Sequence, residues 1–260
     1  MRLSYSEIEK IVNLKDSIFS KATKIFLFGS RVDDSKKGGD IDLFIQSDED
    51  NLLEKKITYL ELLKDVFGEQ KIDIVYAKDE NRMIEQEALK KGIELNLKTI
   101  KLEKYFKECD KHVQRIEEAY TDMKNCMPLS VEKYKNLSKD EVQDIDQYLY
   151  RFSKLQDTLG DKVFKLIIEE YVDNIDTLSF TDILNRLEKT EYLNSAKEWK
   201  YLRELRNEIA HQYDDEADEM TQAINNIVSY KEVIIAIYLK LKNRYLSQVN
   251  IDDAKKSNIQ

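Results

Sequence analysis

The 260-residue chain has little of what would build a fold from short strands and turns. It contains one proline, Pro128, and six glycines, and this scarcity favours long, uninterrupted helices. Its two cysteines, Cys109 and Cys126, make neither a metal-ligand spacing nor a disulfide framework, so we expect both to pack as small apolar side chains. No signal peptide opens the chain, and no apolar run approaches the roughly 20 residues of a membrane span. We therefore expect a cytoplasmic protein with no membrane partner.

Positive charge is also in short supply. The chain has 42 Lys and Arg against 51 Asp and Glu, which gives a formal net charge of −9. Non-specific binding of nucleic acid depends on cations that neutralise phosphates, and this composition does not favour it. Any contact with RNA must therefore come from a local cluster of side chains rather than from the overall field of the protein.

The first hundred residues combine helical and strand patterns. Ser4 and Glu7 have the spacing of a capping box before a predicted amphipathic helix that reaches Ser20. Short apolar or alternating runs then predict strands at residues 24–28, 40–45 and 71–76, with a helix over 51–67. We predict an α/β domain over residues 1–100.

Helical spacing alone governs the chain after residue 100. One apolar stripe covers residues 102–123, and His112 lies next to it, where a structural or merely exposed role is expected. Further helices are predicted near residues 138–158, 161–172, 180–190, 195–213 and 216–246. The fold class is therefore α+β, with an all-helical bundle over residues 101–248 and a loose polar tail over 249–260.

Three aspartates follow a strand that ends at Gly29-Ser30. Alternate residues of a strand share a face, so Asp40 and Asp42 present their carboxylates side by side, and Asp73 on the 71–76 strand could reach the same ion. Two such anions repel unless a cation lies between them, and Mg²⁺ prefers oxygen ligands together with substrate phosphates. An isolated Asp-x-Asp pair would also fit a solvated strand face, but the whole combination favours a metal site.

The segment FGSRVDDSKKGGDIDLFI resembles the polymerase-β-like nucleotidyltransferase superfamily, in particular its minimal nucleotidyltransferase branch. The resemblance covers residues 1–100 and implies transfer of AMP from ATP with the help of Mg²⁺. Asp40 and Asp42 would hold the metal, with Asp73 as a further ligand that also orients or deprotonates the attacking hydroxyl. Gly29 and Ser30 would bind the nucleotide through a close backbone and free N–H groups. Arg31 is either a phosphate contact or an exposed surface arginine.

A second group of polar residues lies on the helix predicted over 195–213. Arg206, His211 and Tyr213 follow one another there, with Asn207 directly after the arginine. An imidazole can move a proton near neutral pH and an arginine can stabilise charge on a phosphate, so the pair suits metal-independent cleavage of RNA. As a bare pattern, an arginine and a histidine five residues apart also occur in purely structural helices.

This second group resembles the HEPN family (higher eukaryotes and prokaryotes nucleotide-binding), whose ribonuclease toxins carry Arg-[Asn/Asp]-x3-His. An extended form of that motif adds a tyrosine, which a partner nucleotidyltransferase adenylylates to silence the ribonuclease. The resemblance implies that Arg206 and His211 are catalytic, that Tyr213 is the modification acceptor, and that the chain forms a homodimer. It implies a fused toxin–antitoxin unit, although in the family the two parts are usually separate proteins.

Two alternatives remain open from the sequence. In one, the helical domain only binds a small-molecule acceptor, as in aminoglycoside nucleotidyltransferases, and Arg206 and His211 are structural. In the other, the two domains pair without catalysis and the first simply covers the second.

Overall fold

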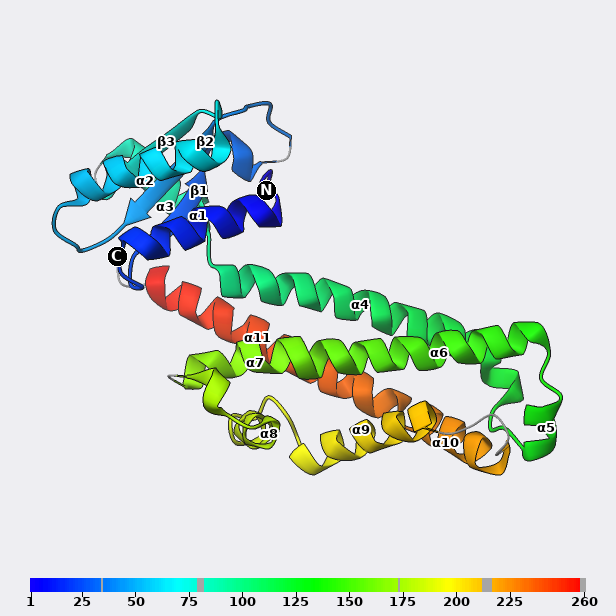
Figure 1. Ribbon diagram of the computed structural model, residues 1–260. Coiled ribbons are helices and arrows are strands. Elements are labelled where there is room, and N and C mark those ends of the chain that lie inside the picture. Colours follow the sequence, from blue (N-terminus) through cyan, green and yellow to red (C-terminus); the bar gives the residue numbers. More distant parts are fainter. Residues whose placement is uncertain (34, 79–81, 173, 212–216, 258–260) are drawn as a thin grey trace. The chain divides into compact units, whose positions relative to one another are not determined.

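The computed structural model describes residues 1–33, 35–78, 82–172, 174–211 and 217–257, with only the backbone path for 210, 211 and 249–257. The chain divides into two compact units, Met1–Lys101 and Leu102–Gln260. Figure 1 shows a small sheet with helices in the first unit and helices alone in the second. Within the described part of the chain, no helix combines the length and the apolar character that a membrane span requires.

A four-stranded sheet forms the centre of the first unit. Its strands are β1 (Lys24–Phe28), β2 (Ile41–Gln46), β3 (Ile72–Tyr76) and β4 (Ile93–Glu94), in the spatial order β3-β2-β1-β4. Strand β1 is antiparallel to both β2 and β4, whereas β2 and β3 are parallel. The three strands predicted from the sequence are confirmed. The two-residue β4 is too short to give an alternating pattern and was not predicted.

Helices cover the two faces of this sheet unequally. On one face, α1 (Tyr5–Ile18) and α2 (Leu52–Phe67) bury the apolar strand residues, and the Tyr59 hydroxyl donates to the Ile11 carbonyl at 2.7 Å. The capping box of Ser4 and Glu7 begins α1 as predicted. On the other face, α3 (Met83–Lys91) contributes to a much smaller core of Phe28, Phe44 and Ala88. Because strand residues alternate between faces, Asp42 and Asp73 lie on this less covered side.

Helices of very different lengths build the second unit. They are α4 (Leu97–Met123), α5 (Val131–Lys135), α6 (Lys139–Asp157), α7 (Phe164–Ile168), α8 (Phe180–Lys189), α9 (Ala196–His211), α10 (Ala217–Ser229) and α11 (Lys231–Ser257). Figure 1 shows α4, α6 and α11 running alongside one another, and the Tyr238 hydroxyl of α11 donates to the Phe106 carbonyl of α4 at 3.0 Å. Both cysteines are buried in this unit. Burial raises the pKa of the Cys109 thiol to about 12.

Several helix boundaries differ from those predicted. The helix expected over 216–246 is two helices that meet at Tyr230. This break was not predicted because no glycine or proline marks it. A π-helical segment, Thr158–Val163, joins α6 to α7 where separate helices were expected. Helix α11 also continues through residues 249–257, which were expected to form a loose tail; good helix formers such as Ala254 let it continue.

Candidate active site

The turn after β1 brings the backbone against one of the aspartates. Gly29 has φ of +72°, a conformation that other residues adopt only with strain. A Cβ on Gly29 would lie 2.2 Å from Oδ2 of Asp42, because Phe28 and Asp42 are partners in the β1–β2 register. Glycine is therefore needed here both for the turn and for the close approach of the Asp42 carboxylate.

The register of the parallel strands places charged residues side by side. Asp42 on β2 is the register partner of Asp73 on β3. Where the two strands begin, the Ile41 N–H donates to the Lys71 carbonyl at 2.9 Å, so Asp40 and Lys71 flank the same end of the sheet. The strand ends thus gather the three predicted aspartates in one place, together with a lysine that the sequence analysis did not single out.

Lys71 makes direct ion pairs with two of the three aspartates. Its Nζ lies 2.7 Å from Oδ2 of Asp40 and 3.1 Å from Oδ2 of Asp73. These two carboxylates raise the pKa of Lys71, so the ammonium stays charged. The signal in the sequence was its position two residues before Asp73, which puts both side chains on the same side of the strand.

Asp42 has the most perturbed surroundings of the three. Partial burial raises the pKa of this carboxyl, and the negative charges of Asp73 and Asp40 raise it further. Lys71 and Arg31 act in the opposite direction. Carboxylates that repel one another in this way are a site where an added cation is favoured.

The residues present fit a divalent cation, although they are not yet arranged as a coordination shell. Among the described residues, no group of three His, Cys, Asp or Glu side chains is placed to hold a metal ion. Instead the Lys71 ammonium pairs with Asp40 and Asp73, as a stand-in cation among oxygen ligands. Carboxylate oxygens are the hard ligands that divalent cations such as Mg²⁺ prefer.

Arg31 stabilises the loop that leads into β2. Its Nε donates to the carbonyls of Gly39 (3.2 Å) and Asp40 (3.1 Å), and its Nη2 donates to Oε1 of Gln70 at 3.1 Å. The side chain is 13% exposed, which places it inside the loop rather than on the surface. Arg31 therefore positions the backbone of Asp40, a role that neither of the two expectations for this residue included.

The turn residue Ser30 is also held by contacts within the unit. Its carbonyl accepts from Nη2 of Arg2 at 2.8 Å, and a Cβ on Gly38 would approach the Ser30 hydroxyl to 2.2 Å. Gly29 and Ser30 thus form a close-packed turn beside Asp42, with the loop around Gly38 folded over it.

In the second unit, Arg206 is the one member of the predicted catalytic group whose side chain is described. Nη2 of Arg206, on α9, lies 2.5 Å from Oδ1 of Asp157, the last residue of α6, and Nη1 donates to Oδ1 of Asn207 at 3.2 Å. The Nε atom of Arg206 is buried and has no hydrogen-bond partner among the described residues. Asp157 lies 49 positions before Arg206, so no local pattern could have revealed it.

The other two members of that group are not placed. His211 ends α9, and only its backbone is described. Tyr213 lies outside the described residues. The proposed neighbourhood of Arg206, His211 and Tyr213 therefore stays a prediction.

The remaining histidine has no place in either group. His112 on α4 is 7% exposed, and its Nε2 is 3.9 Å from Oε1 of Glu108. Burial lowers the pKa of His112, and the nearby positive charge of Arg151 lowers it further. A buried, neutral imidazole of this kind is structural, in line with one of the two roles expected for it.

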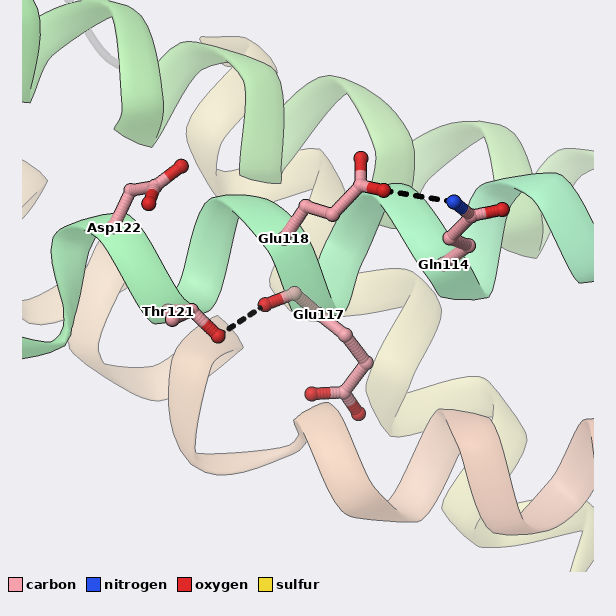
Figure 2. A pocket seen from close by; sticks show the side chains of 5 residues that line it. All are labelled: Gln114, Glu117, Glu118, Thr121 and Asp122. Carbon is pink, nitrogen blue, oxygen red and sulfur yellow. Dashed lines mark hydrogen bonds between the residues drawn. The ribbon is translucent and has the colours of Figure 1, made fainter.

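An open hollow on α4 offers no second candidate. It is lined by Gln114, Glu117, Glu118, Thr121 and Asp122, and Figure 2 shows these side chains along a single helix. Gln114 donates to Glu118 at 2.8 Å, and Glu117 accepts from Lys231 at 2.7 Å. The three carboxylates of this hollow would repel the phosphates of a nucleotide.

Comparison with known proteins covers the first unit only. Residues 7–99 match the family described as polymerase beta, nucleotidyltransferase, and this range includes Gly29, Asp40, Asp42 and Asp73. No curated protein and no solved structure matches the chain. The match to this nucleotidyltransferase family thus lies within the first unit, which holds the aspartates.

Proposed function

We propose that the first unit transfers AMP from ATP to a hydroxyl group with the help of Mg²⁺. The observation that carries the proposal is the gathering of Asp40, Asp42 and Asp73 at one end of the sheet, directly beside the Gly29 turn. These three residues would hold the metal. Bound there, the ion would neutralise the triphosphate and stabilise the charge that develops on the transferred phosphoryl group.

The side chains of the site have separate tasks in this reaction. The acceptor oxygen forms a bond to the α-phosphorus, the bond to pyrophosphate breaks, and the hydroxyl proton passes to the exposed carboxylate of Asp73. Arg31 keeps the backbone of Asp40 in place through its bonds to the Gly39 and Asp40 carbonyls. Gly29 lets the Asp42 carboxylate lie against the turn that would face the phosphates.

The acceptor that we propose is Tyr213 of the helical unit. The proposal rests on the sequence order Arg206, His211, Tyr213 and on the readiness of Arg206 to bind an anion, which its ion pair with Asp157 illustrates. In this view Arg206 and His211 cleave RNA without a metal, and an adenylyl phosphate on Tyr213 would pair with Arg206 in place of the RNA phosphate. The chain would then be a fused toxin–antitoxin protein of HEPN type that acts as a homodimer.

The test is the intact mass of the full chain after incubation with ATP and Mg²⁺. We expect a gain of one adenylyl group, which peptide mapping places on Tyr213 and which Tyr213→Phe abolishes. Asp40→Asn/Asp42→Asn should show no gain while its circular dichroism stays unchanged, because these partly exposed strand-end residues contribute little to the core.

Other outcomes of the same incubation distinguish the alternatives. A label that appears only on an added small molecule would assign the helical unit as an acceptor-binding domain. An adduct at another residue, or equal labelling of Tyr213→Phe, would contradict the tyrosine assignment alone. If neither the protein nor any added acceptor gains a label, the two units pair without catalysis and the proposal of nucleotidyl transfer is wrong.

A further inference from the structure

Lys71 completes the charge arrangement at the end of the sheet. It directly precedes β3, two residues before Asp73, and lies beside Asp40, which directly precedes β2; it forms ion pairs with both aspartates. We propose that Lys71 is an internal cation that holds the aspartates together in the metal-free protein and must be displaced before a divalent cation binds. The inference rests on the proposed function to the extent that Asp40, Asp42 and Asp73 are taken as the metal site.

The exposure of the three side chains allows this exchange. Lys71, Asp40 and Asp73 are 64%, 45% and 56% exposed, respectively. The ammonium can therefore swing into water without breaking any part of the core. Ion pairs at such exposure are weak, so a divalent ion can replace this one.

The second cation beside the site, Arg31, cannot take this role. It is 13% exposed, and its guanidinium donates to the carbonyls of Arg2, Gly39 and Asp40. Those bonds to three carbonyls would be lost if Arg31 moved. Of these two cations, Lys71 is thus the one that competes with a metal.

The proposal has opposite consequences for the protein with and without metal. Without metal, removal of the ammonium leaves three neighbouring carboxylates with less compensation, which lowers stability. With metal, removal of the ammonium eliminates a competitor and a repelling charge, which strengthens metal binding. At the distances of these ion pairs, the loss of one positive charge near the surface should tighten binding of a divalent ion by about tenfold.

The experiment titrates the full chain with Mn²⁺ and measures the free ion by electron paramagnetic resonance. Lys71→Met and Lys71→Gln are compared with Lys71→Arg, which keeps the charge. Lys64→Met is the matched control, because it removes another exposed positive charge, from α2 of the same unit. We expect tighter binding in Lys71→Met and Lys71→Gln, and affinities near the wild-type value in the other two variants.

Melting temperatures supply a second measurement. In EDTA, Lys71→Met should melt below the wild-type protein, and saturating Mn²⁺ should close that gap or reverse it. Equal or weaker Mn²⁺ binding by both uncharged variants would overturn the proposal, as would the absence of binding in every variant. If Lys71→Met is the one protein of the set that binds Mn²⁺, that result would support the proposal.

The outcome is independent of nucleotidyl transfer. Tighter Mn²⁺ binding in the uncharged variants without any transfer from ATP would support the role of Lys71 and contradict the proposed function. Transfer by the wild-type chain, with Mn²⁺ binding unchanged in the uncharged Lys71 variants, would support the proposed function and contradict the role of Lys71. Asp40→Asn/Asp42→Asn shows which part of the bound Mn²⁺ belongs to this site, because that part should be lost.

Discussion

The two units of this protein place their polar groups by different means. In the first unit, neighbouring strands bring Asp42 and Asp73 together through a fixed register. In the second, Arg206 meets Asp157 only because two helices far apart in sequence pack against each other. The difference decides what a sequence can reveal, since a strand register follows from spacing and a contact between helices does not.

The same difference determines how each group tolerates substitution. The aspartate site depends on a backbone turn that only glycine allows, and so it should be sensitive at a residue that takes no part in the chemistry. The group around Arg206 depends on side chains at the surface of helices. The largest effect that we expect is therefore at Gly29.

Gly29→Ala should lower nucleotidyl transfer by roughly hundredfold, because an error of about 1 Å in a reacting group can cost this much. The new Cβ would lie 2.2 Å from Oδ2 of Asp42 and would push that carboxylate out of the site. Positive φ at Gly29 adds backbone strain, so the free energy of unfolding should fall as well. Transfer from labelled ATP and urea unfolding measure the two effects.

Gly68→Ala is the matched control for this experiment. Gly68 also has positive φ, at +62°, but no atom lies within 4 Å of the position that its Cβ would take. This variant should lose stability by about 1 kcal/mol without losing transfer activity. If both alanine variants keep wild-type transfer rates, the close approach of Gly29 to Asp42 has no part in the activity.

The site of the first unit could be predicted from the sequence to a large extent. Alternation in two strands was enough to place Asp40, Asp42 and Asp73 at one end of the sheet. The contacts of Lys71 and Arg31 were not predicted, because long side chains reach several neighbours and spacing does not say which one they choose. Helix α3, at Met83–Lys91, was also not predicted, since a nine-residue helix offers little periodicity.

In the second unit, local signals defined how helices begin but not how they end or pack. Ser138 and Glu141 have the spacing of a capping box, as do Ser179 and Asp182, and each pair forms one at the start of its helix. The break at Tyr230 has no glycine or proline to mark it, and the π-helical segment after Asp157 fills the gap that was expected between helices at 138–158 and 161–172. Packing of the whole bundle decides such features, and it lies beyond the reach of a single helical pattern.

A smaller effect should separate the roles of the two partners in the Arg206 ion pair. Arg206→Gln should lower metal-independent RNA cleavage at least roughly tenfold if its guanidinium stabilises charge on the phosphate. Asp157→Asn should not lower it, because the loss of that carboxylate frees the guanidinium. Both side chains are about one-third exposed, at 31% and 36%, so each change should cost less than about 1 kcal/mol of stability. Cleavage of labelled RNA in EDTA measures the activity.

Equal loss of cleavage in the two variants would show instead that the pair acts as a structural unit. In that case, the helical group would depend on fixed geometry in the same way as the aspartate site. The two units would then differ only in how far the sequence reveals their polar groups, and not in how those groups tolerate substitution.

The smallest effect concerns the buried imidazole of His112. Burial and the charges of Arg151 and Lys154 lower its pKa in the folded protein, against a weaker opposite effect of Glu108. Below the ordinary pKa of about 6.5, the unfolded chain therefore binds more protons at His112 than the folded chain does. Stability is fully present above that value and is lost as the pH falls toward the lowered pKa, with a slope of at most about 1.4 kcal/mol per pH unit.

His112→Gln should remove this loss, because glutamine does not titrate. Urea unfolding at pH 7.5 and 5.5 should show a smaller difference for the variant than for the wild-type protein. His211→Gln is the control, since His211 is the one other histidine of the chain. If His112→Gln keeps the full acid-induced loss, the imidazole is protonated inside the bundle, and its compensation by Glu108, 3.9 Å away, outweighs burial. Packing of the helices would then hold His112 and Glu108 together as a charge pair, just as the strand register holds Asp42 beside Asp73 in the first unit.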